Sequence, residues 1–230
     1  MVFESRERAA ELLALRLMAY RGRNPLVLGI PRGAVVMARV IARELGGQVD
    51  IALVHKLRAP RQPELAIGAV DEAGNIALEP FAAEAGATER YVQAERDVQL
   101  AGLRARRSAY TPARPALDPR GRVVIVVDDG VATGATMAAA LHSLREKGPE
   151  RLVAAAGVAA AEAVDRLSAL ADEVAVLEIP HELDAVSLWF QHFPQVEDAE
   201  VVALLRAAEG EAGGRETPPK VGPSPAAEAL

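Results

Sequence analysis

The sequence predicts an α/β fold: a mainly parallel sheet flanked by helices. Largely apolar segments at residues 25–30, 49–54 and 122–128 alternate with segments of helical periodicity. Strands that are apolar throughout are typical of a parallel sheet that is buried on both faces. The order strand, helix, strand near the start of the chain also favours parallel pairing, because parallel strands need a crossover connection.

Helices are predicted wherever apolar residues recur every three to four positions between charged ones. The first predicted helix carries four leucines and a methionine interrupted by charges, and the second is closed by two glycines, which suit a helix end. The predicted helices cover residues 4–21, 34–45, 88–108, 136–147, 161–171 and 196–208. Further strands are expected at residues 151–158 and 173–179, with residues 122–128 central in the sheet.

The segment after the second strand is expected to contain an exposed loop followed by a hairpin. Residues 56–63 are rich in proline and arginine, which predicts an exposed loop. The turn sequence Asp-Glu-Ala-Gly at residues 71–74 lies between two short apolar stretches and predicts a hairpin.

The chain of 230 residues suits one domain, expected at residues 1–208. Residues 209–230 are rich in glycine, proline, serine and glutamate, which predicts a flexible tail. The N-terminus is charged and no apolar run approaches ~20 residues, so neither a signal peptide nor a membrane span is expected, and the cytoplasm is the expected location.

Composition and missing motifs argue against several classes of function. The formal net charge is −6 and the basic residues are scattered, so no nucleic-acid partner is expected. The chain has no GxxxxGK[ST] sequence, which argues against P-loop phosphoryl transfer, and no GxGxxG after a strand, which argues against dinucleotide binding. Four scattered histidines and no cysteines do not make a zinc site.

The strongest functional signal is the loop that follows the strand at residues 122–128. That strand delivers two adjacent carboxylates, Asp128 and Asp129, to its carboxyl end, where ligands of open α/β sheets bind. Mostly small and hydroxyl-bearing residues follow: Gly130, Val131, Ala132, Thr133, Gly134, Ala135 and Thr136. Small residues let the backbone approach a ligand, and the N-terminus of the next helix suits a phosphate. Carboxylates beside it suit ribose hydroxyls, directly or through Mg²⁺, so the loop predicts a ribose 5-phosphate site.

Residues 123–136 also resemble the signature of the type I phosphoribosyltransferases, which is about four apolar residues, two acidic residues, a short variable stretch and Thr-Gly-x-Thr. This resemblance implies a Rossmann-like core that binds 5-phosphoribosyl-1-pyrophosphate (PRPP) with Mg²⁺. It further implies that Asp128 and Asp129 are catalytic and hold the ribose hydroxyls or the metal, while residues 130–136 bind the 5′-phosphate.

Two further positions fit the same family. Its pyrophosphate loop follows the first core strand, where this chain has Pro31-Arg32-Gly33 and offers backbone N–H groups and a guanidinium. The family often carries a lysine after the next strand, and Lys56 stands there in a chain that uses arginine almost throughout. The resemblance implies that Arg32, Gly33 and Lys56 bind pyrophosphate, with Lys56 catalytic. It also implies a flexible flap at about residues 57–80, which closes over the site and excludes water, and a small hood at about residues 180–195. The alternatives are an ordinary strand-to-helix turn and a solvated surface lysine.

More distantly, residues 3–205 resemble a group of predicted phosphoribosyltransferases that has no settled acceptor. The shared features include an Arg- and Glu-rich N-terminal helix, Glu-Leu-Ala-Ile-Gly-Ala at residues 64–69 and Phe-x-Gln-Val-x-Asp at residues 193–198. Ala132 departs from purine-salvage members, which place an acidic residue there, so a general base must come from elsewhere. Candidates by position are His181, Glu182, Asp184 and His192.

The resemblance predicts an enzyme that transfers 5-phosphoribosyl from PRPP to a nitrogen acceptor, such as a nucleobase, with release of pyrophosphate. Trp189 and Phe190 in the hood suit the stacking of a base, and equally well packing in the core or in the dimer that is common in this family. Two alternatives stay open. One is a PRPP- or nucleotide-sensing regulator with little or no transferase activity, and the other is a hydrolase of phosphoribosyl compounds.

Overall fold

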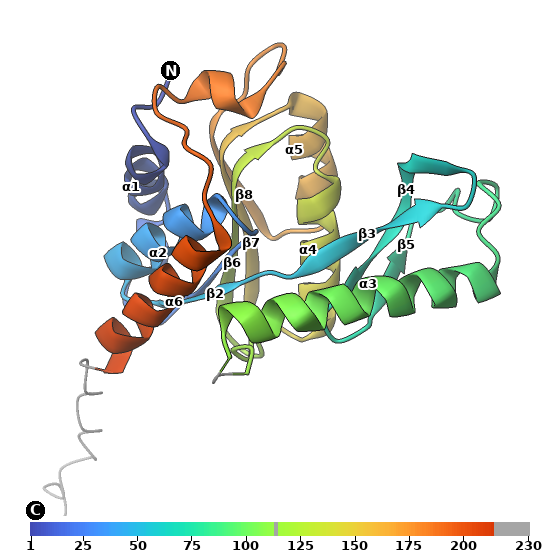
Figure 1. The fold of residues 1–230 in the computed structure, drawn as a ribbon. Helices are drawn as coiled ribbons and strands as arrows, with labels where there is room; N and C mark the ends of the chain where they lie inside the picture. Colours follow the sequence, from blue (N-terminus) through green and yellow to red (C-terminus); the bar gives the residue numbers. More distant parts are fainter. Residues whose placement is uncertain (113–114, 214–230) are drawn as a thin grey trace, which may run out of the picture.

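The computed structural model describes residues 1–112 and 115–213 and contains a five-stranded parallel sheet with the strand order β2-β1-β6-β7-β8 (Figure 1). The strands of this sheet are β1 (Leu26–Gly29), β2 (Gln48–Ile51), β6 (Val123–Val131), β7 (Arg151–Ala159) and β8 (Glu173–Glu178). The predicted α/β class is therefore confirmed, and β6 is the central strand, as its apolar sequence predicts.

Helices cover both faces of this sheet. Successive side chains of β6 point to opposite sides, and because they are apolar on both sides, both faces must be buried. Val123, Ile125 and Val127 join one buried cluster, whereas Val124 and Val126 join another. Helices α1, α2 and α6 pack on the first face and helices α4 and α5 on the second (Figure 1). Their bounds are α1 (Arg6–Arg16), α2 (Ala34–Leu45), α4 (Ala135–Glu146), α5 (Ala161–Ser168) and α6 (Asp198–Gly213).

A three-stranded antiparallel sheet, here called the arm, projects from the main sheet with helix α3 along it (Figure 1). The arm consists of β3 (Val54–Ala59), β4 (Gln62–Asp71) and β5 (Ile76–Leu78), and α3 covers Glu89–Tyr110. The expected loop at residues 56–63 is wrong. Lys56 and Arg58 are exposed whereas Leu57 and Ala59 are buried, which is the alternation of a strand. The expected strand at residues 49–54 is likewise divided between β2 and β3.

The hairpin predicted around residues 71–74 is confirmed. Asp71 and Asn75 are joined through their backbones, with 3.1 Å between the nitrogen of Asp71 and the oxygen of Asn75. Gly74 takes a φ of 90°, a conformation that favours glycine. The predicted flexibility of the flap remains a prediction, and its residues 57–80 coincide largely with the strands of the arm.

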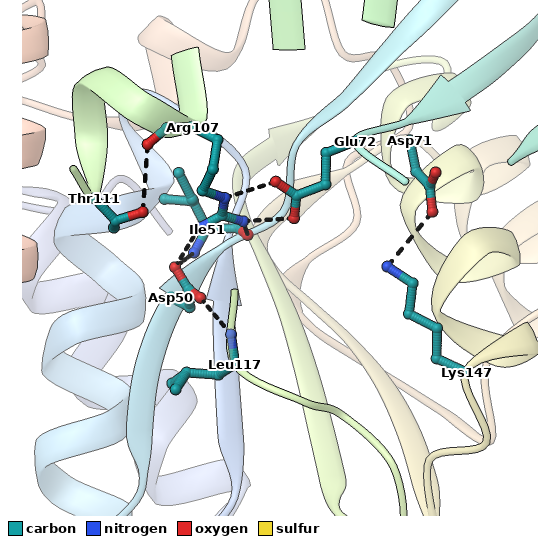
Figure 2. A network of polar contacts seen from close by, with 8 residues as sticks. All are labelled: Asp50, Ile51, Asp71, Glu72, Arg107, Thr111, Leu117 and Lys147. Carbon is teal, nitrogen blue, oxygen red and sulfur yellow. Dashed lines mark hydrogen bonds and ion pairs between the residues drawn. The ribbon is translucent and has the colours of Figure 1, made fainter. Parts of the chain in front are cut away.

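Arg107 of α3 ties the arm to the main sheet (Figure 2). Its Nη1 donates to Asp50 of β2 at 2.8 Å, and its Nε and Nη2 donate to Glu72, beside the β4–β5 turn, at 2.6 and 2.7 Å. Burial alone would lower the pKa of Arg107, but the hydrogen bonds to Glu72 and the charge of Asp50 raise it above its ordinary value. A neighbouring pair joins Lys147, just after α4, to Asp71 at 3.4 Å.

The two ends of the described chain differ from expectation in detail. The first predicted helix, residues 4–21, is divided into α1 and a 3-10 turn, η1 (Met18–Tyr20). Helix α6 continues to Gly213 and therefore includes residues 209–213 of the predicted tail. The rest of that tail, residues 214–230, lies outside the described residues. Among the residues that are described, no helix has both the length and the apolar content that a membrane crossing requires.

Candidate active site

The predicted site lies at the carboxyl edge of the main sheet, where β1 and β6 run side by side in parallel. Ile30, just after β1, donates its backbone N–H to the carbonyl oxygen of Val127 at 3.0 Å, which holds the two following loops together. The Pro-Arg-Gly loop therefore starts beside the part of β6 that carries Asp128 and Asp129. The peptide bond between Pro31 and Arg32 in the first loop is cis.

Asp128 and Asp129 lie within β6 rather than after it, because the strand continues to Val131. The backbone N–H of Asp129 donates to Oδ1 of Asp128 at 2.9 Å. Burial, followed by the negative charge of Asp129, holds the pKa of Asp128 well above its usual range. Since neighbouring strand residues face opposite sides, Asp129 points to the face that α1 covers and meets Arg6 there.

Gly33 allows the Pro-Arg-Gly loop to reach this pair of charges. Nε of Arg6 lies 2.9 Å from Oδ2 of Asp129, and the side chain of Arg6 is only 8% exposed. A Cβ atom at position 33 would stand 2.4 Å from Oδ2 of Asp129 and 2.8 Å from Nε of Arg6. The structure thus brings the predicted Asp129 and Gly33 together. Arg6 was missed from the sequence, whose only signal was the abundance of charge near the N-terminus.

Replacing Gly33 by alanine is expected to force Asp129 and Arg6 apart, because the new methyl group takes the space between them. We expect the affinity for PRPP to fall by roughly 10- to 100-fold, as for other displacements of a positioning group. Calorimetric titration measures this. The matched control is Gly102→Ala on α3, where an added Cβ meets nothing within 4 Å and where alanine favours the helix. Equal affinities of the two variants would contradict the prediction.

The loop after the two aspartates forms a helix N-terminus without a side-chain cap. Gly134 is the N-cap of α4 with a φ of 74°, and Ala138 makes the first helical hydrogen bond to its carbonyl oxygen at 2.8 Å. Thr133 Oγ1 accepts from Ala135 N at 3.4 Å. The remaining N–H groups of the first turn and the helix dipole make this a suitable position for a phosphate.

The hood segment presses on the same loop. A Cβ at Gly130 would lie 2.3 Å from the side chain of Val186, which begins the 3-10 turn η2 (Val186–Trp189). Phe190 is buried, and its ring packs 5.4 Å from Phe3 and 4.9 Å from Phe193 between centroids. Of the two roles that the sequence left open for this aromatic pair, packing is therefore the one found for Phe190.

The general acid and base candidates lie on the surface of the hood. All four are exposed: His181, Glu182, Asp184 and His192. Within the described residues, no group of three or more histidine, cysteine, aspartate or glutamate side chains is arranged to hold a metal ion. Asp128 and Asp129 still fit Mg²⁺, because this ion usually keeps several waters and binds one or two carboxylates together with the phosphates of a substrate.

Arg32 is held by the start of α6. Its Nη1 lies 3.3 Å from Oε2 of Glu197 and 4.0 Å from Oδ1 of Asp198. Tyr110 of α3 donates to the same Asp198 oxygen at 2.5 Å, and burial together with this hydrogen bond raises the pKa of Tyr110 to about 12. A ligand that recruits Arg32 must therefore compete with two exposed carboxylates.

Lys56 lies in β3 and lines an open pocket of about 340 Å³ between the arm, α3 and the start of α4. Thr136 of the phosphate loop lines the same pocket, as do Arg58 and Arg106. The side chains of three cations, Lys56, Arg58 and Arg106, form no ion pair with a residue that the structure describes. Arg58 and Arg106 were missed from the sequence, because nothing in it links α3 to the phosphate loop. The predicted residues thus form two groups, one around Asp129 and Gly33 and one around Lys56 and Thr136.

Comparison with known proteins identifies the family of this chain. The phosphoribosyl transferase domain model matches residues 4–190. The crystal structure of TT1426 from Thermus thermophilus superposes with a TM-score of 0.82 at 45% identity, over 89% of this chain and 98% of that one. A putative phosphoribosyl transferase of Mycobacterium tuberculosis is 37% identical over 215 residues.

The aligned part covers 90% of this chain and 47% of the mycobacterial protein, so the chain spans about half the length of that relative. A ribose-phosphate pyrophosphokinase of Pyrococcus furiosus is 41% identical over 75 residues, which are 31% of this chain and 27% of that protein. The family model covers most of the chain, from residue 4 to residue 190. The chain belongs to the phosphoribosyl transferase domain family, which is a family of enzymes.

Proposed function

We propose that this chain transfers the 5-phosphoribosyl group of PRPP to a nitrogen acceptor, of which a nucleobase is the leading class, in a Mg²⁺-dependent reaction that releases pyrophosphate. The observation that carries this proposal is the uncapped N-terminus of α4 directly after the paired carboxylates of the central strand. A phosphate and a ribose require these two features side by side.

Each part of the site has a role in this proposal. Asp128 and Asp129 hold the ribose hydroxyls or the waters of the metal, and the N–H groups of residues 132–136 bind the 5′-phosphate. Arg32 and the backbone at Gly33 bind the pyrophosphate. When bound, Mg²⁺ neutralises charge on the departing pyrophosphate.

The reaction exchanges one bond at ribose C1 for another. The bond from C1 to the pyrophosphate oxygen breaks, a bond from C1 to the acceptor nitrogen forms, and the proton of that nitrogen leaves. The residues of this chain contribute position and charge, which commonly supply most of the catalysis in such transfers. Lys56 is assigned to the pyrophosphate, and Arg58 and Arg106 line the same pocket and add positive charge to it.

The first test is calorimetric titration of PRPP into the protein with and without Mg²⁺. We expect binding in the micromolar range that requires Mg²⁺, followed by pyrophosphate release when nucleobases are screened as acceptors. Tight binding without turnover would favour the regulator, and release of ribose 5-phosphate without an acceptor would favour the hydrolase. No heat in either condition would contradict the proposal itself.

Replacing Lys56 by glutamine is expected to weaken the binding of PRPP more than the binding of ribose 5-phosphate, because only PRPP carries the pyrophosphate. The loss of one charge-assisted hydrogen bond, worth ~1.5–3 kcal/mol, predicts a fall of roughly 10- to 100-fold for PRPP. Parallel titrations of the two ligands measure the difference. The control is Arg104→Gln, which removes an exposed charge from α3 outside the pocket. An equal loss of affinity for both ligands would show that Lys56 does not bind the pyrophosphate.

A further inference from the structure

Arg6 is an arginine buried at the first position of α1. Its Nε donates to Oδ2 of Asp129 at 2.9 Å, and its Nη1 donates to the carbonyl oxygen of Pro194 at 2.7 Å. Its guanidinium carbon lies 3.7 Å from the centroid of the Phe193 ring. These contacts use the edge and the face of one planar group, so the guanidinium is fixed in both position and orientation.

The contacts of Arg6 join segments that are far apart in the sequence. Asp129 lies 123 residues away near the end of β6, and Pro194 lies 188 residues away in the hood. The Pro-Arg-Gly loop reaches the same point, since a Cβ on Gly33 would lie 2.9 Å from Nη2 of Arg6. Arg6 therefore lies where three parts of the site meet. These are the carboxylate of Asp129, which is proposed to bind ribose, the proposed pyrophosphate loop, and the hood.

The N-terminus and the hood are packed as one unit around this point. The N–H of Phe3 donates to the carbonyl oxygen of Trp189 at 2.8 Å, and the rings of Phe3, Phe190 and Phe193 follow one another in contact. Arg6 stacks on the last of these rings and links it to Asp129. Movement of the hood and orientation of Asp129 are thus connected through one side chain.

We propose that Arg6 is a positioning residue for the PRPP site, which orients Asp129 towards the ribose and ties the hood to it. The inference rests on the proposed function, because it takes Asp129 as a ribose-binding group. Lysine cannot replace arginine in this role. A single ammonium group has no planar fork that donates to a carboxylate and a carbonyl while its face stacks on an aromatic ring.

The test uses Arg6→Lys and Arg6→Met, with Arg8→Met as the matched control. Arg8 lies on the same helix, where it pairs with Glu11 on the exposed surface. For both Arg6 variants we expect the Kd of PRPP and of ribose 5-phosphate to rise by roughly 10- to 100-fold, because Asp129 is misplaced. The Kd of magnesium pyrophosphate, which has no ribose, should stay within ~3-fold of the wild-type value.

A second measurement follows the hood without any ligand. Trp189 is the only tryptophan in the chain, so its fluorescence reports on the hood alone. We expect acrylamide to quench this fluorescence more strongly in both Arg6 variants than in the wild-type protein, whereas Arg8→Met should match the wild type. All measurements are made well below the melting temperature of each variant, so that the folded proteins are compared.

Two results would overturn the inference. One is an Arg6→Lys variant with wild-type affinities and wild-type quenching, since the guanidinium geometry would then be unnecessary. The other is an Arg6→Met variant that melts at a lower temperature but keeps both readouts, since the ion pair would then be structural only. A wild-type protein that binds none of these ligands would overturn the proposed function instead, and the quenching of Trp189 would still decide whether Arg6 holds the hood.

Discussion

Asp128→Asn is expected to reduce the Mg²⁺-dependent affinity for PRPP by at least ~100-fold, because the lost carboxylate would make charge-assisted hydrogen bonds worth ~1.5–3 kcal/mol each. The substitution keeps the local structure, since an amide oxygen can still accept the N–H of Asp129 at the 2.9 Å contact. Calorimetric titration with PRPP and Mg²⁺ measures the loss. Asp165→Asn, which alters an exposed carboxylate on α5, is the control.

The same variant is expected to be more stable than the wild-type protein at neutral pH. Burial and the neighbouring Asp129 raise the pKa of Asp128 in the folded state, so the folded protein holds this proton more tightly than the unfolded chain does. Ionising Asp128 therefore costs stability once the pH rises above the ordinary aspartate pKa of ~4, and the cost is complete above the raised folded pKa. Asparagine carries no such cost, so its stabilising effect should disappear as the pH falls towards ~4.

Thermal melting at several pH values tests whether Asp128→Asn stabilises the fold at neutral pH. A gain of ~1 kcal/mol would raise the melting temperature by ~2–4 °C in a chain of this size. A variant that loses both PRPP binding and stability at neutral pH would indicate a structural carboxylate. Loss of binding with a gain of stability is the result expected of a group kept for function at the expense of the fold.

The main sheet and the phosphate loop could be predicted because their signals are local. Continuous apolar runs identify strands buried on both faces, and Gly134 follows the two aspartates within one short segment. The arm was only half predicted. Pro60 and Pro63 suggested a loop, whereas the tertiary contacts of Leu57 and Ala59 with the core make the surrounding residues strands.

The parts of the site that were missed come from distant segments. Arg6 meets Asp129 across 123 residues, and Arg106 reaches the pocket of Lys56 from a helix that carries many other arginines. No spacing rule links such residues in one sequence, because the contact depends on how helices pack against the sheet. The sequence could name the residues of the central loop, while the charges that surround it required the tertiary structure.

Arg107→Met is expected to destabilise the fold by up to ~3–5 kcal/mol, which is typical of breaking a buried ion pair from one side. Asp50 is 1% exposed and Glu72 is largely buried, and both would lose the guanidinium that lies between them (Figure 2). At ~2–4 °C per kcal/mol, the melting temperature should fall by roughly 6–20 °C. Arg104→Met, three residues earlier on the exposed side of α3, should change it little.

The loss should also be uneven across the molecule, because Arg107 joins the arm to β2 and not the strands of the main sheet to one another. Amide hydrogen exchange should speed up in the arm, residues 54–78, by more than in β6. The double variant Arg107→Met with Asp50→Asn should recover part of the stability, since it removes a buried charge along with its partner. Uniform exchange rates with no recovery in the double variant would mean that Arg107 supports the whole core. In that case Lys56, Arg58 and the rest of the arm would not move independently of the phosphate loop.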